Sequence, residues 1–378
     1  MKSGVGAVSR RRRRQGGQVD ELGNEARRTV AAAKLRGFCQ VVLERLDVPA
    51  DEAELIAENL VDADLRGVES HGVVRFPIYC QRLACRANNP RPTLRIHRET
   101  PATAVMDGDN GMGQLVGVRA MQLAIDKARE GLPAVVAVRG SNHYGAAAYY
   151  ALMAARADLI GISTTIGGIN HMVPWGGAEA RLGNNPFAVA LPAGEEFPVV
   201  LDMACSVAAR GKIIVAAKTG TPIPADWAVG PDGEPTTDAV RALEGFVQPV
   251  GGAKGYALTL TIGLLSTMLT DAFFGTEVTH MYEDLERPQN VGHLMAAIPV
   301  DLFTDRDVYR TRMDKAVREM REAKRAPGVE RIYLPGEREH LWKAERERGG
   351  VALPLAVLDE LRQTGADAGV DIDPFLAT

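Results

Sequence analysis

The sequence predicts an α/β fold in which helical segments at both ends of the chain flank a central sheet. Strand-like and helix-like stretches alternate from about residue 102 to residue 202, apolar residues recur at helical spacing before residue 65, and charged amphipathic segments return after residue 299. A chain of 378 residues exceeds one ordinary core. We therefore divide it into a tail at 1–26, a helical segment at 27–100, an α/β segment at 101–295 and a helical segment at 296–378 that packs with the first one.

The composition and charge indicate a globular protein and disfavour several other classes. Hydrophobic residues make up 46% of the chain, charged residues 24%, and the net charge of −4 disfavours a nucleic-acid-binding or membrane-binding surface. No stretch of ~18 apolar residues occurs, so we expect no membrane-spanning helix. The four cysteines form no CxxC pair and no Cys/His cluster, so we expect free thiols, no metal site and a cytoplasmic protein.

The tail at 1–26 contains five consecutive arginines, from Arg10 to Arg14. A secretory signal would place an apolar stretch of ~7–15 residues behind such a charge run, and none follows. A disordered extension, or a start codon assigned too far upstream, explains the run better than a nucleic-acid-binding arm does.

Helices are expected along most of the segment before residue 100. Apolar residues recur at helical spacing from Ala26 to about Leu65, which predicts a helix pair. The phrase Ser70-His71-Gly72-Val73-Val74-Arg75 follows as a turn into a further helix that runs through Tyr79.

The elements after residue 100 follow from the same patterns. Strands are expected at 104–107, 134–138, 159–165, 187–191 and 198–202, and helices at 114–130, 146–157, 208–215, 256–269, 305–324 and 355–364. Phrases at strand-to-helix junctions commonly carry the ligands of such sheets, so the phrase after the 134–138 strand is a candidate site.

That phrase, Ser141-Asn142-His143-Tyr144-Gly145, and the earlier one around His71 suggest acid/base chemistry. Histidine titrates near neutral pH and passes protons in both directions. Judged alone, a histidine at the position of His143 is structural about as often as catalytic, but the neighbouring amide and glycine favour a ligand site. Arg75 offers a planar fork for a carboxylate. A base beside a carboxylate clamp suits an enzyme that acts on a small hydroxy or keto acid.

The roles of the residues around His71 stay open at this point. His71 can line a site, orient a substrate through Ser70, or cap a helix. Arg75, four residues later, shares its helical face, and the alternative is an ordinary surface arginine.

The common nucleotide and hydrolase signatures are missing. The chain contains no GxGxxG, GxxxxGK[ST], HExxH or GxSxG motif, so a nicotinamide enzyme would need an unconventional cofactor site. Lys254, in the turn Gly251-Gly252-Ala253-Lys254-Gly255, can meet a phosphate or carboxylate, or be a solvated loop lysine. Asp202, at a strand end, can accept ribose hydroxyls or cap the helix that follows.

A set of motifs in one order resembles the malate/L-lactate/sulfolactate dehydrogenase family from about Ala31 to Thr364. The motifs are Ala63-Asp64-Leu65-Arg66-Gly67, the two histidine phrases, Asp107-Gly108-Asp109-Asn110-Gly111, Val173-Pro174-Trp175-Gly176-Gly177, Gly183-Asn184-Asn185-Pro186, Leu201-Asp202-Met203-Ala204-Cys205-Ser206, Ala209-Arg210-Gly211-Lys212, the Lys254 turn and Leu334-Pro335-Gly336-Glu337. The resemblance implies a non-Rossmann nicotinamide-binding fold around a mixed sheet, a helical domain formed by the N- and C-terminal segments, and a homodimer.

The resemblance also implies roles for single residues. His143 matches the acid/base residue, and Ser70, His71 and Arg75 match the segment that holds the substrate and the nicotinamide. The expected cofactor-contacting residues are Gly167, Gly168, Asp202, Met203, Ala204, Lys254 and Gly255. The family usually has threonine at the positions of Asn184 and Cys205, and the stretch 164–171 also differs from its usual pattern, which leaves NAD or NADP as the cofactor.

The function implied is NAD- or NADP-dependent interconversion of a small 2-hydroxy acid, such as malate, lactate or sulfolactate, and its 2-keto acid. Two alternatives within the family are reduction of a cyclic imino acid and oxidation of ureidoglycolate. A non-catalytic ligand-binding protein on the same fold is a third, and the intact pair of His71 and His143 speaks against it.

Overall fold

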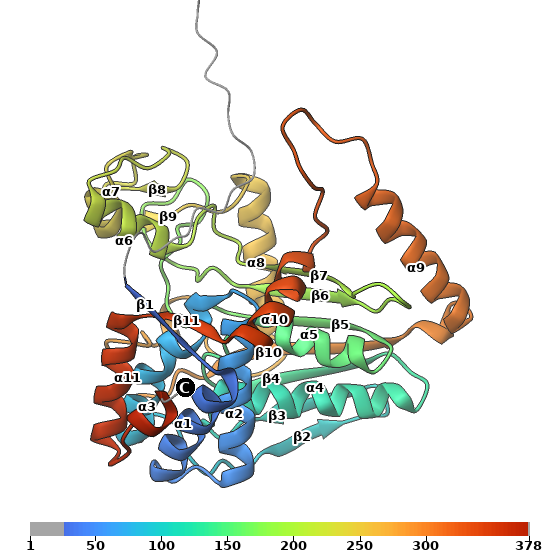
Figure 1. Ribbon diagram of the computed structural model, residues 1–378, viewed down its shortest axis with the longest axis horizontal. Coiled ribbons are helices and arrows are strands. Elements are labelled where there is room, and N and C mark those ends of the chain that lie inside the picture. Colours follow the sequence, from blue (N-terminus) through green and yellow to red (C-terminus); the bar gives the residue numbers. More distant parts are fainter. Residues whose placement is uncertain (1–25, 377–378) are drawn as a thin grey trace, which may run out of the picture.

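A seven-stranded mixed sheet forms the centre of the computed structural model, which describes residues 26–376 (Figure 1). The strands, in spatial order, are β2 Arg95–Glu99, β3 Thr103–Asp107, β4 Ala134–Ser141, β10 Val291–Pro299, β5 Leu159–Thr165, β6 Phe187–Leu191 and β7 Val199–Met203. β3 and β4 are parallel, and every other neighbouring pair is antiparallel. The predicted α/β fold with a mixed sheet is confirmed. The predicted tail lies outside the described residues, apart from Ala26.

The central strand, β10, lies where the sequence predicts no strand. It pairs with β4 on one side and β5 on the other, so that His293 stands opposite Val138 and Thr165. Most of its side chains are buried, and strands covered on both faces lack the polar–apolar alternation that reveals a strand. β2, also outside the predicted strands, is an edge strand whose five residues are all exposed.

Helices cover both faces of the sheet. α4 Gly113–Arg129 and α5 Ala147–Arg156 pack on one face and α8 Ala253–Thr267 on the other. Two adjacent residues of β5 show this division, because neighbouring side chains of a strand point to opposite faces. Ser163 Oγ lies 3.1 Å from the hydroxyl of Tyr144, beside α5, whereas Thr164 Oγ1 lies 2.8 Å from Ser266 Oγ of α8. His143 lies between β4 and α5, just past the end of a strand that helices cover on both faces.

The two ends of the chain share one apolar cluster beside the sheet (Figure 1). It joins α1 Ala32–Arg45, α2 Ala50–Leu65 and α3 Phe76–Ala84 to α11 Leu355–Asp367 and α12 Asp373–Leu376, while α10 Glu337–Gly349 packs on α2. The helical prediction for residues 27–30 is wrong. They form β1 Arg27–Val30, which pairs antiparallel with β11 Val351–Pro354. Local spacing cannot reveal this pairing, because the partner lies at the other end of the chain.

A small lobe stands above the sheet at the upper left of Figure 1. It contains α6 Arg210–Thr219, β8 Ala228–Val229, α7 Ala239–Glu244 and β9 Phe246–Val247. Its apolar cluster includes Met172 and Leu182 from the loop after β5, so that loop is part of the lobe's core.

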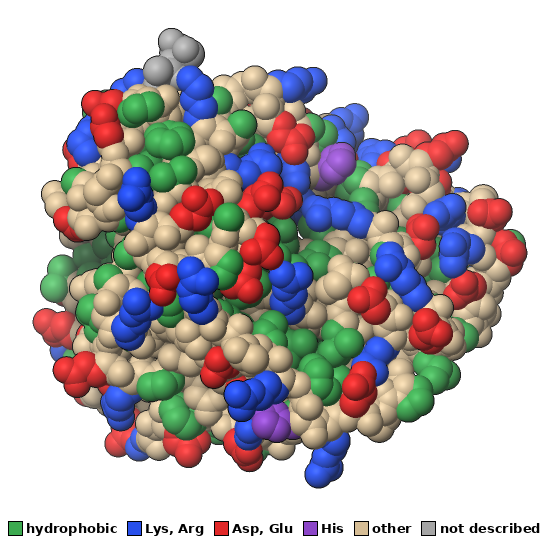
Figure 2. Space-filling view, turned by 90° about the horizontal axis from the view of Figure 1, so that it is seen from below, with side chains coloured by type: hydrophobic (Ala, Val, Ile, Leu, Met, Phe, Trp, Pro, Cys, Tyr) green, Lys and Arg blue, Asp and Glu red, His purple; other side chains and the backbone are tan. Residues whose placement is uncertain are grey.

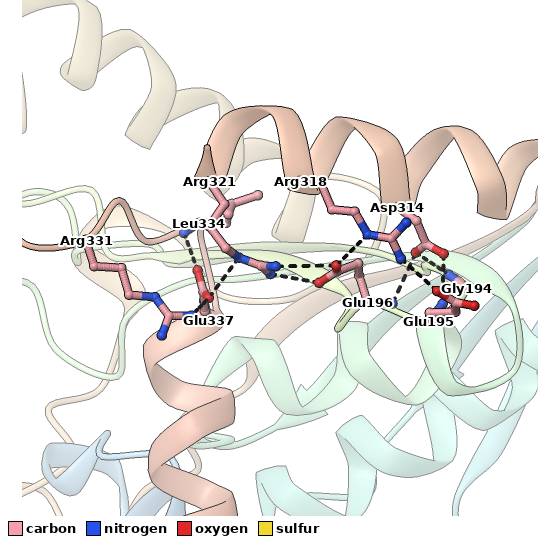
Figure 3. A network of polar contacts seen from close by, with 9 residues as sticks. All are labelled: Gly194, Glu195, Glu196, Asp314, Arg318, Arg321, Arg331, Leu334 and Glu337. Carbon is pink, nitrogen blue, oxygen red and sulfur yellow. Dashed lines mark hydrogen bonds and ion pairs between the residues drawn. The ribbon is translucent and has the colours of Figure 1, made fainter. Parts of the chain in front are cut away.

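A charged arm, α9 Arg306–Arg321, projects from the sheet and is tied down by ion pairs (Figure 3). Asp314 accepts hydrogen bonds from the backbone N–H groups of Gly194, Glu195 and Glu196 at 2.9, 2.9 and 3.1 Å. Arg321 pairs with Glu196 at 2.8 Å and with the buried Glu337 of α10 at 3.4 Å. Single exposed ion pairs contribute ~0–1 kcal/mol, but this network connects α9 both to the β6–β7 turn and to α10.

Charges of both signs are mixed on the surface. On the face drawn in Figure 2, Lys and Arg side chains lie among Asp and Glu side chains. Within residues 26–376, no helix has the length and apolarity needed to cross a bilayer. In the same part of the chain, no three His, Cys, Asp or Glu side chains gather in a way that could hold a metal ion.

Candidate active site

The backbone of His143 is fixed by residues on three sides. Asn142 Nδ2 donates to the carbonyl oxygens of Asn110 and Gly111 at 3.1 and 2.8 Å, and the His143 N–H donates to Gln289 Oε1 at 3.3 Å. A Cβ at Gly113 would lie 2.2 Å from the Asn142 carbonyl oxygen, so only glycine lets α4 begin this close to the segment. The strand end therefore presents His143 in a defined position.

The ring of His143 meets two side chains from the N-terminal part of the chain. The Tyr79 hydroxyl of α3 lies 2.6 Å from His143 Nδ1. The His71 ring, in the short helix η1 Glu69–His71, stacks on the His143 ring with 5.6 Å between centroids. No side chain or backbone group of residues 26–376 bonds to His143 Nε2. One ring nitrogen is thus held by the protein and the other is left for a ligand.

Burial keeps these groups neutral at pH 7. It lowers the pKa of His143 well below 6.5, and the nearby His71 and Arg75 add to this shift. Burial, followed by the charge of Arg75, lowers the pKa of His71 to about 4. Burial raises the pKa of Tyr79, so its hydroxyl keeps its proton. A neutral imidazole with one nitrogen on a hydroxyl is able to accept or return a proton at the other nitrogen.

The segment from Ser70 to Arg75, which contains His71, is held in place by the buried carboxyl group of Asp64. Asp64 Oδ2 of α2 accepts a hydrogen bond from the Val73 N–H at 2.9 Å. A Cβ at Gly72 would lie 2.0 Å from Asp64 Oδ1, so the turn requires glycine there. Ser70 Oγ lies 2.9 Å from His71 Nδ1, which connects the two side chains.

Arg75, at the end of η2 Val73–Arg75, keeps part of its guanidinium available. Its Nε donates to the Ser70 carbonyl oxygen at 2.7 Å, and its Nη1 donates to the Tyr282 hydroxyl. The guanidinium carbon lies 5.7 Å from the centre of the Tyr282 ring. Within residues 26–376 no acceptor bonds to Nη2, so this nitrogen can meet a carboxylate.

The predicted glycine loop reaches the same place. A Cβ at Gly168 would lie 3.5 Å from His143 Cβ, and the Gly168 carbonyl oxygen accepts from Gln289 Nε2 at 3.1 Å. Gly167, before it, donates its N–H to Asn185 Oδ1 at 3.1 Å. His143, His71, Ser70, Arg75, Gly167 and Gly168 are therefore brought together.

A second group of predicted residues lies at the start of α8. Lys254 is exposed in the first turn, and no side chain caps this helix end, so its N–H groups suit an anion. Met203 and Ala204 lead into Cys205, whose carbonyl oxygen accepts from the Val250 N–H at 2.8 Å, just before this turn.

Trp175 links the two groups. A Cβ at Gly252, at the start of α8, would lie 3.1 Å from its indole, which is 54% exposed. The loop that passes His143 at Gly168 thus continues to the α8 turn. These residues fit a dinucleotide, because the ring face of Trp175 on the loop after β5 lies beside the uncapped start of α8.

Asp202 does not cap the helix that follows it. Its Oδ2 accepts from the Ala148 N–H at 3.0 Å, in the first turn of α5, so it caps a helix that precedes it in sequence. His171, in the loop after β5, lies with Nδ1 3.2 Å from the Ile169 carbonyl oxygen of the same loop.

Three site residues, Tyr79, Gln289 and Tyr282, are not among those predicted from the sequence. Tyr79 lies four residues after Arg75, so the helical spacing of i and i+4 could have placed both on one face. Gln289 and Tyr282 carry no such signal, because they reach His143 and Arg75 from 146 and 207 residues away.

Comparison with known proteins agrees with the motifs. The family model described as malate/L-lactate dehydrogenase matches residues 30–362. Malate dehydrogenase of Pyrococcus abyssi is 40% identical over 94% of this chain and 98% of that protein. The solved structure of sulfolactate dehydrogenase from Methanocaldococcus jannaschii has a TM-score of 0.87 at 38% identity and covers 92% of this chain and 100% of that one.

Relatives named for either nicotinamide cofactor are also found. Ureidoglycolate dehydrogenase (NAD(+)) of Escherichia coli K12 is 36% identical over 86% of this chain and 90% of that protein. Another relative is named for NADP(+). The prediction of an oxidoreductase that uses NAD or NADP is confirmed, and the chain belongs to the malate/L-lactate dehydrogenase family.

Proposed function

We propose that this protein interconverts a small 2-hydroxy acid and its 2-keto acid, with His143 as the acid/base residue. The observation that carries the proposal is the ring of His143, which is neutral, bonded to Tyr79 at Nδ1 and unbonded at Nε2, beside the unfilled donor of Arg75. When bound, the nicotinamide cofactor supplies hydride transfer at the carbon that carries the hydroxyl.

Tyr79 lets His143 work in both directions. A tyrosine hydroxyl both donates and accepts, so it can follow either protonation state of the imidazole. During oxidation, His143 Nδ1–H donates to the Tyr79 oxygen while Nε2 takes the proton of the substrate hydroxyl. During reduction, the imidazolium returns that proton from Nε2. Burial, which disfavours the charged imidazolium, makes the return favourable.

Arg75, His71 and Ser70 hold the acid. The Ser70 carbonyl and the Tyr282 hydroxyl fix two nitrogens of Arg75, which aims the third as a preorganised donor for the carboxylate. Neutral His71, held by Ser70 and stacked on His143, lines the same space without adding charge. Anchoring the carboxylate places the adjacent carbon, where the alkoxide forms, near Nε2.

The cofactor residues belong to the two groups described above. We assign the nicotinamide end to Gly167 and Gly168 because this loop contacts His143. We assign the phosphates to Lys254 and Gly255 at the uncapped start of α8. Met203 and Ala204 lie on the adjoining strand end, and Asp202 supports the site through α5.

We further propose that the protein is a homodimer in the cytoplasm. On α8 and in the two residues that follow it, the large exposed apolar side chains recur at helical spacing, namely Leu258, Leu264, Leu265, Met268 and Leu269. An apolar surface of this kind suits burial against a second copy. The four cysteines are free thiols, as is usual in a reducing compartment.

A panel of acids tests the function. We expect NADH or NADPH to be oxidised with at least one of malate-, lactate- or sulfolactate-type 2-keto acids and slowly or not at all with cyclic imines. Turnover restricted to cyclic imines would replace the proposal with a C=N reductase. Cofactor binding without turnover of any compound would contradict an enzyme.

A further inference from the structure

We infer that Gln289 is a positioning residue for the acid/base step, because its side-chain amide fixes the backbone of His143 relative to the glycine loop at Gly168. The inference rests on the proposed function, since it gives Gln289 a part in the same reaction. Gln289 follows the segment at 279–288 and lies two residues before Val291, the first residue of β10, and it is 1% exposed.

Every polar group of this amide has a partner. Oε1 accepts from the His143 N–H at 3.3 Å. Nε2 donates to the carbonyl oxygens of Gly168 at 3.1 Å and Thr279 at 3.3 Å. An amide with two donors and one acceptor engaged in this way has a fixed orientation. The side chain thus joins the end of β4, the loop after β5 and the segment before β10.

The contact between these three segments is close. A Cβ at Gly168 would lie 3.3 Å from Gln289 Nε2 and 3.5 Å from His143 Cβ. The Gly168 carbonyl oxygen also accepts from the Met281 N–H at 3.3 Å. The glycine loop is therefore held on one side by Gln289 and its segment, and on the other it touches His143.

The segment that carries Gln289 is itself anchored. Arg82 of α3, which is 1% exposed, donates to the carbonyl oxygens of Met281, Asp284 and Arg287 at 3.3, 2.7 and 3.2 Å. The Thr279 hydroxyl donates to the Pro288 carbonyl oxygen at 3.0 Å and closes the segment. Because the support is rigid, Gln289 can transmit a fixed position to His143 rather than follow its movement.

Removing the Gln289 amide should lower the reaction rate, because His143 would no longer be held in one orientation. A displacement of ~1 Å in an active site can lower a rate ~10²-fold. The carboxylate clamp keeps its own bonds to Ser70 and Tyr282. We therefore expect the rate of the chemical step to fall more than the affinity for the acid.

The experiment compares Gln289→Met and Gln289→Glu with wild-type holoenzyme and with Val317→Ala, a buried change on the distant α9 arm. Gln289→Met removes all three bonds, and we expect kcat to fall about 10- to 100-fold with less than about a threefold change in KM for the acid. Gln289→Glu keeps an acceptor for the His143 N–H, and its neutral carboxyl can donate one bond. Its activity should therefore approach the wild-type value at low pH and fall as the carboxyl ionises.

A fluorescence titration with NADH gives a readout that needs no turnover. Loss of the bond to Gly168 should weaken NADH binding by about 2- to 12-fold in Gln289→Met, the equivalent of one hydrogen bond. Wild-type kcat and NADH affinity in both variants, or losses no larger than those of Val317→Ala, would overturn the inference. If the wild-type protein turns over no acid, the proposed function fails, and the NADH titration alone decides the link between Gln289 and Gly168.

Discussion

His143 and His293 lie close together but differ in how their ring nitrogens are used. His293, on β10, is fully buried, and both of its nitrogens are bonded: Nδ1 lies 2.8 Å from Thr165 Oγ1 and Nε2 lies 2.7 Å from Ser141 Oγ. Its ring stacks on Tyr144 with 4.6 Å between centroids. This region of the sheet leaves no donor or acceptor of the imidazole for a ligand.

In the region around His143, one nitrogen of the imidazole is left without a partner in the described part of the chain. The His143 backbone is as firmly held as that of a core residue, but Nε2 has no partner among residues 26–376. Burial lowers the pKa of both histidines, to about 3 for His293, so protonation state does not tell them apart. The two histidines differ instead in Nε2, which within residues 26–376 is unbonded only in His143. A buried histidine with two bonds indicates a structural role, and one with a single bond indicates chemistry.

The largest expected effect is on the reaction. His143→Ala should lower kcat about 10²- to 10⁴-fold, because it removes the general acid/base, while thermal stability and NADH affinity stay near wild type. Steady-state kinetics and NADH titration check this. His97→Gln, at an exposed histidine on β2, serves as the control and should keep wild-type kcat. A His143→Ala enzyme at the wild-type rate would remove this residue from proton transfer.

At His293 we expect a loss of stability rather than a loss of activity. His293→Ala should lower the free energy of unfolding by about 3 kcal/mol, because it leaves a cavity and removes the bonds of the imidazole to Ser141 Oγ and Thr165 Oγ1. Urea unfolding measures this loss, and kcat per folded molecule should fall far less than in His143→Ala. A stable His293→Ala protein with a kcat as low as that of His143→Ala would break the distinction between the two histidines.

Arg75, like His143, has a nitrogen without a partner, because no acceptor among residues 26–376 bonds to its Nη2. Arg75→Lys replaces a planar fork with a point charge, so KM for the acid should rise about 10- to 100-fold, or ~1.5–3 kcal/mol, with a smaller change in kcat. Initial rates over a range of acid concentrations check this. Arg91→Lys, at an exposed arginine in the loop before β2, is the matched control. An unchanged KM in Arg75→Lys would mean that another group anchors the carboxylate.

Sequence alone located the parts of this site that depend on local pattern. The alternation from residue 103 to residue 165 placed β3, α4, β4, α5 and β5 within a few residues, and glycine-flanked phrases singled out His71 and His143. β10 was not predicted, because a strand buried on both faces lacks the alternation of polar and apolar residues. Gln289 was not predicted because it meets His143 across 146 residues, and such a contact depends on tertiary packing. Tyr79 has a local signal in its i, i+4 spacing from Arg75, but its contact with His143, across 64 residues, also depends on packing.

The smallest expected effect is on how the free energy of unfolding depends on pH. This dependence reports the titration of His293 separately from its packing. An unfolded histidine has a pKa near 6.5, and burial lowers that of His293 to about 3 in the folded protein. Between these values the unfolded chain binds more protons. The contribution of His293 to stability is therefore fully present above pH 6.5 and is lost as the pH falls toward 3.

The slope of that loss is the measurable quantity. Each such histidine should lower the free energy of unfolding by about 1.4 kcal/mol per pH unit between pH 5.5 and 4. His293→Phe removes the titrating ring, and with it the bonds to Ser141 Oγ and Thr165 Oγ1, at every pH. The variant should thus be less stable than wild type at pH 7. Its free energy of unfolding should fall less steeply on acidification, by about 1.4 kcal/mol less per pH unit, because one proton fewer is taken up on unfolding. Urea unfolding at pH 7, 5.5, 4.75 and 4 gives both slopes. Equal slopes would mean that His293 is protonated in the fold, and its bonds to Thr165 and Ser141 would then have to be hydrogen bonds donated by an imidazolium.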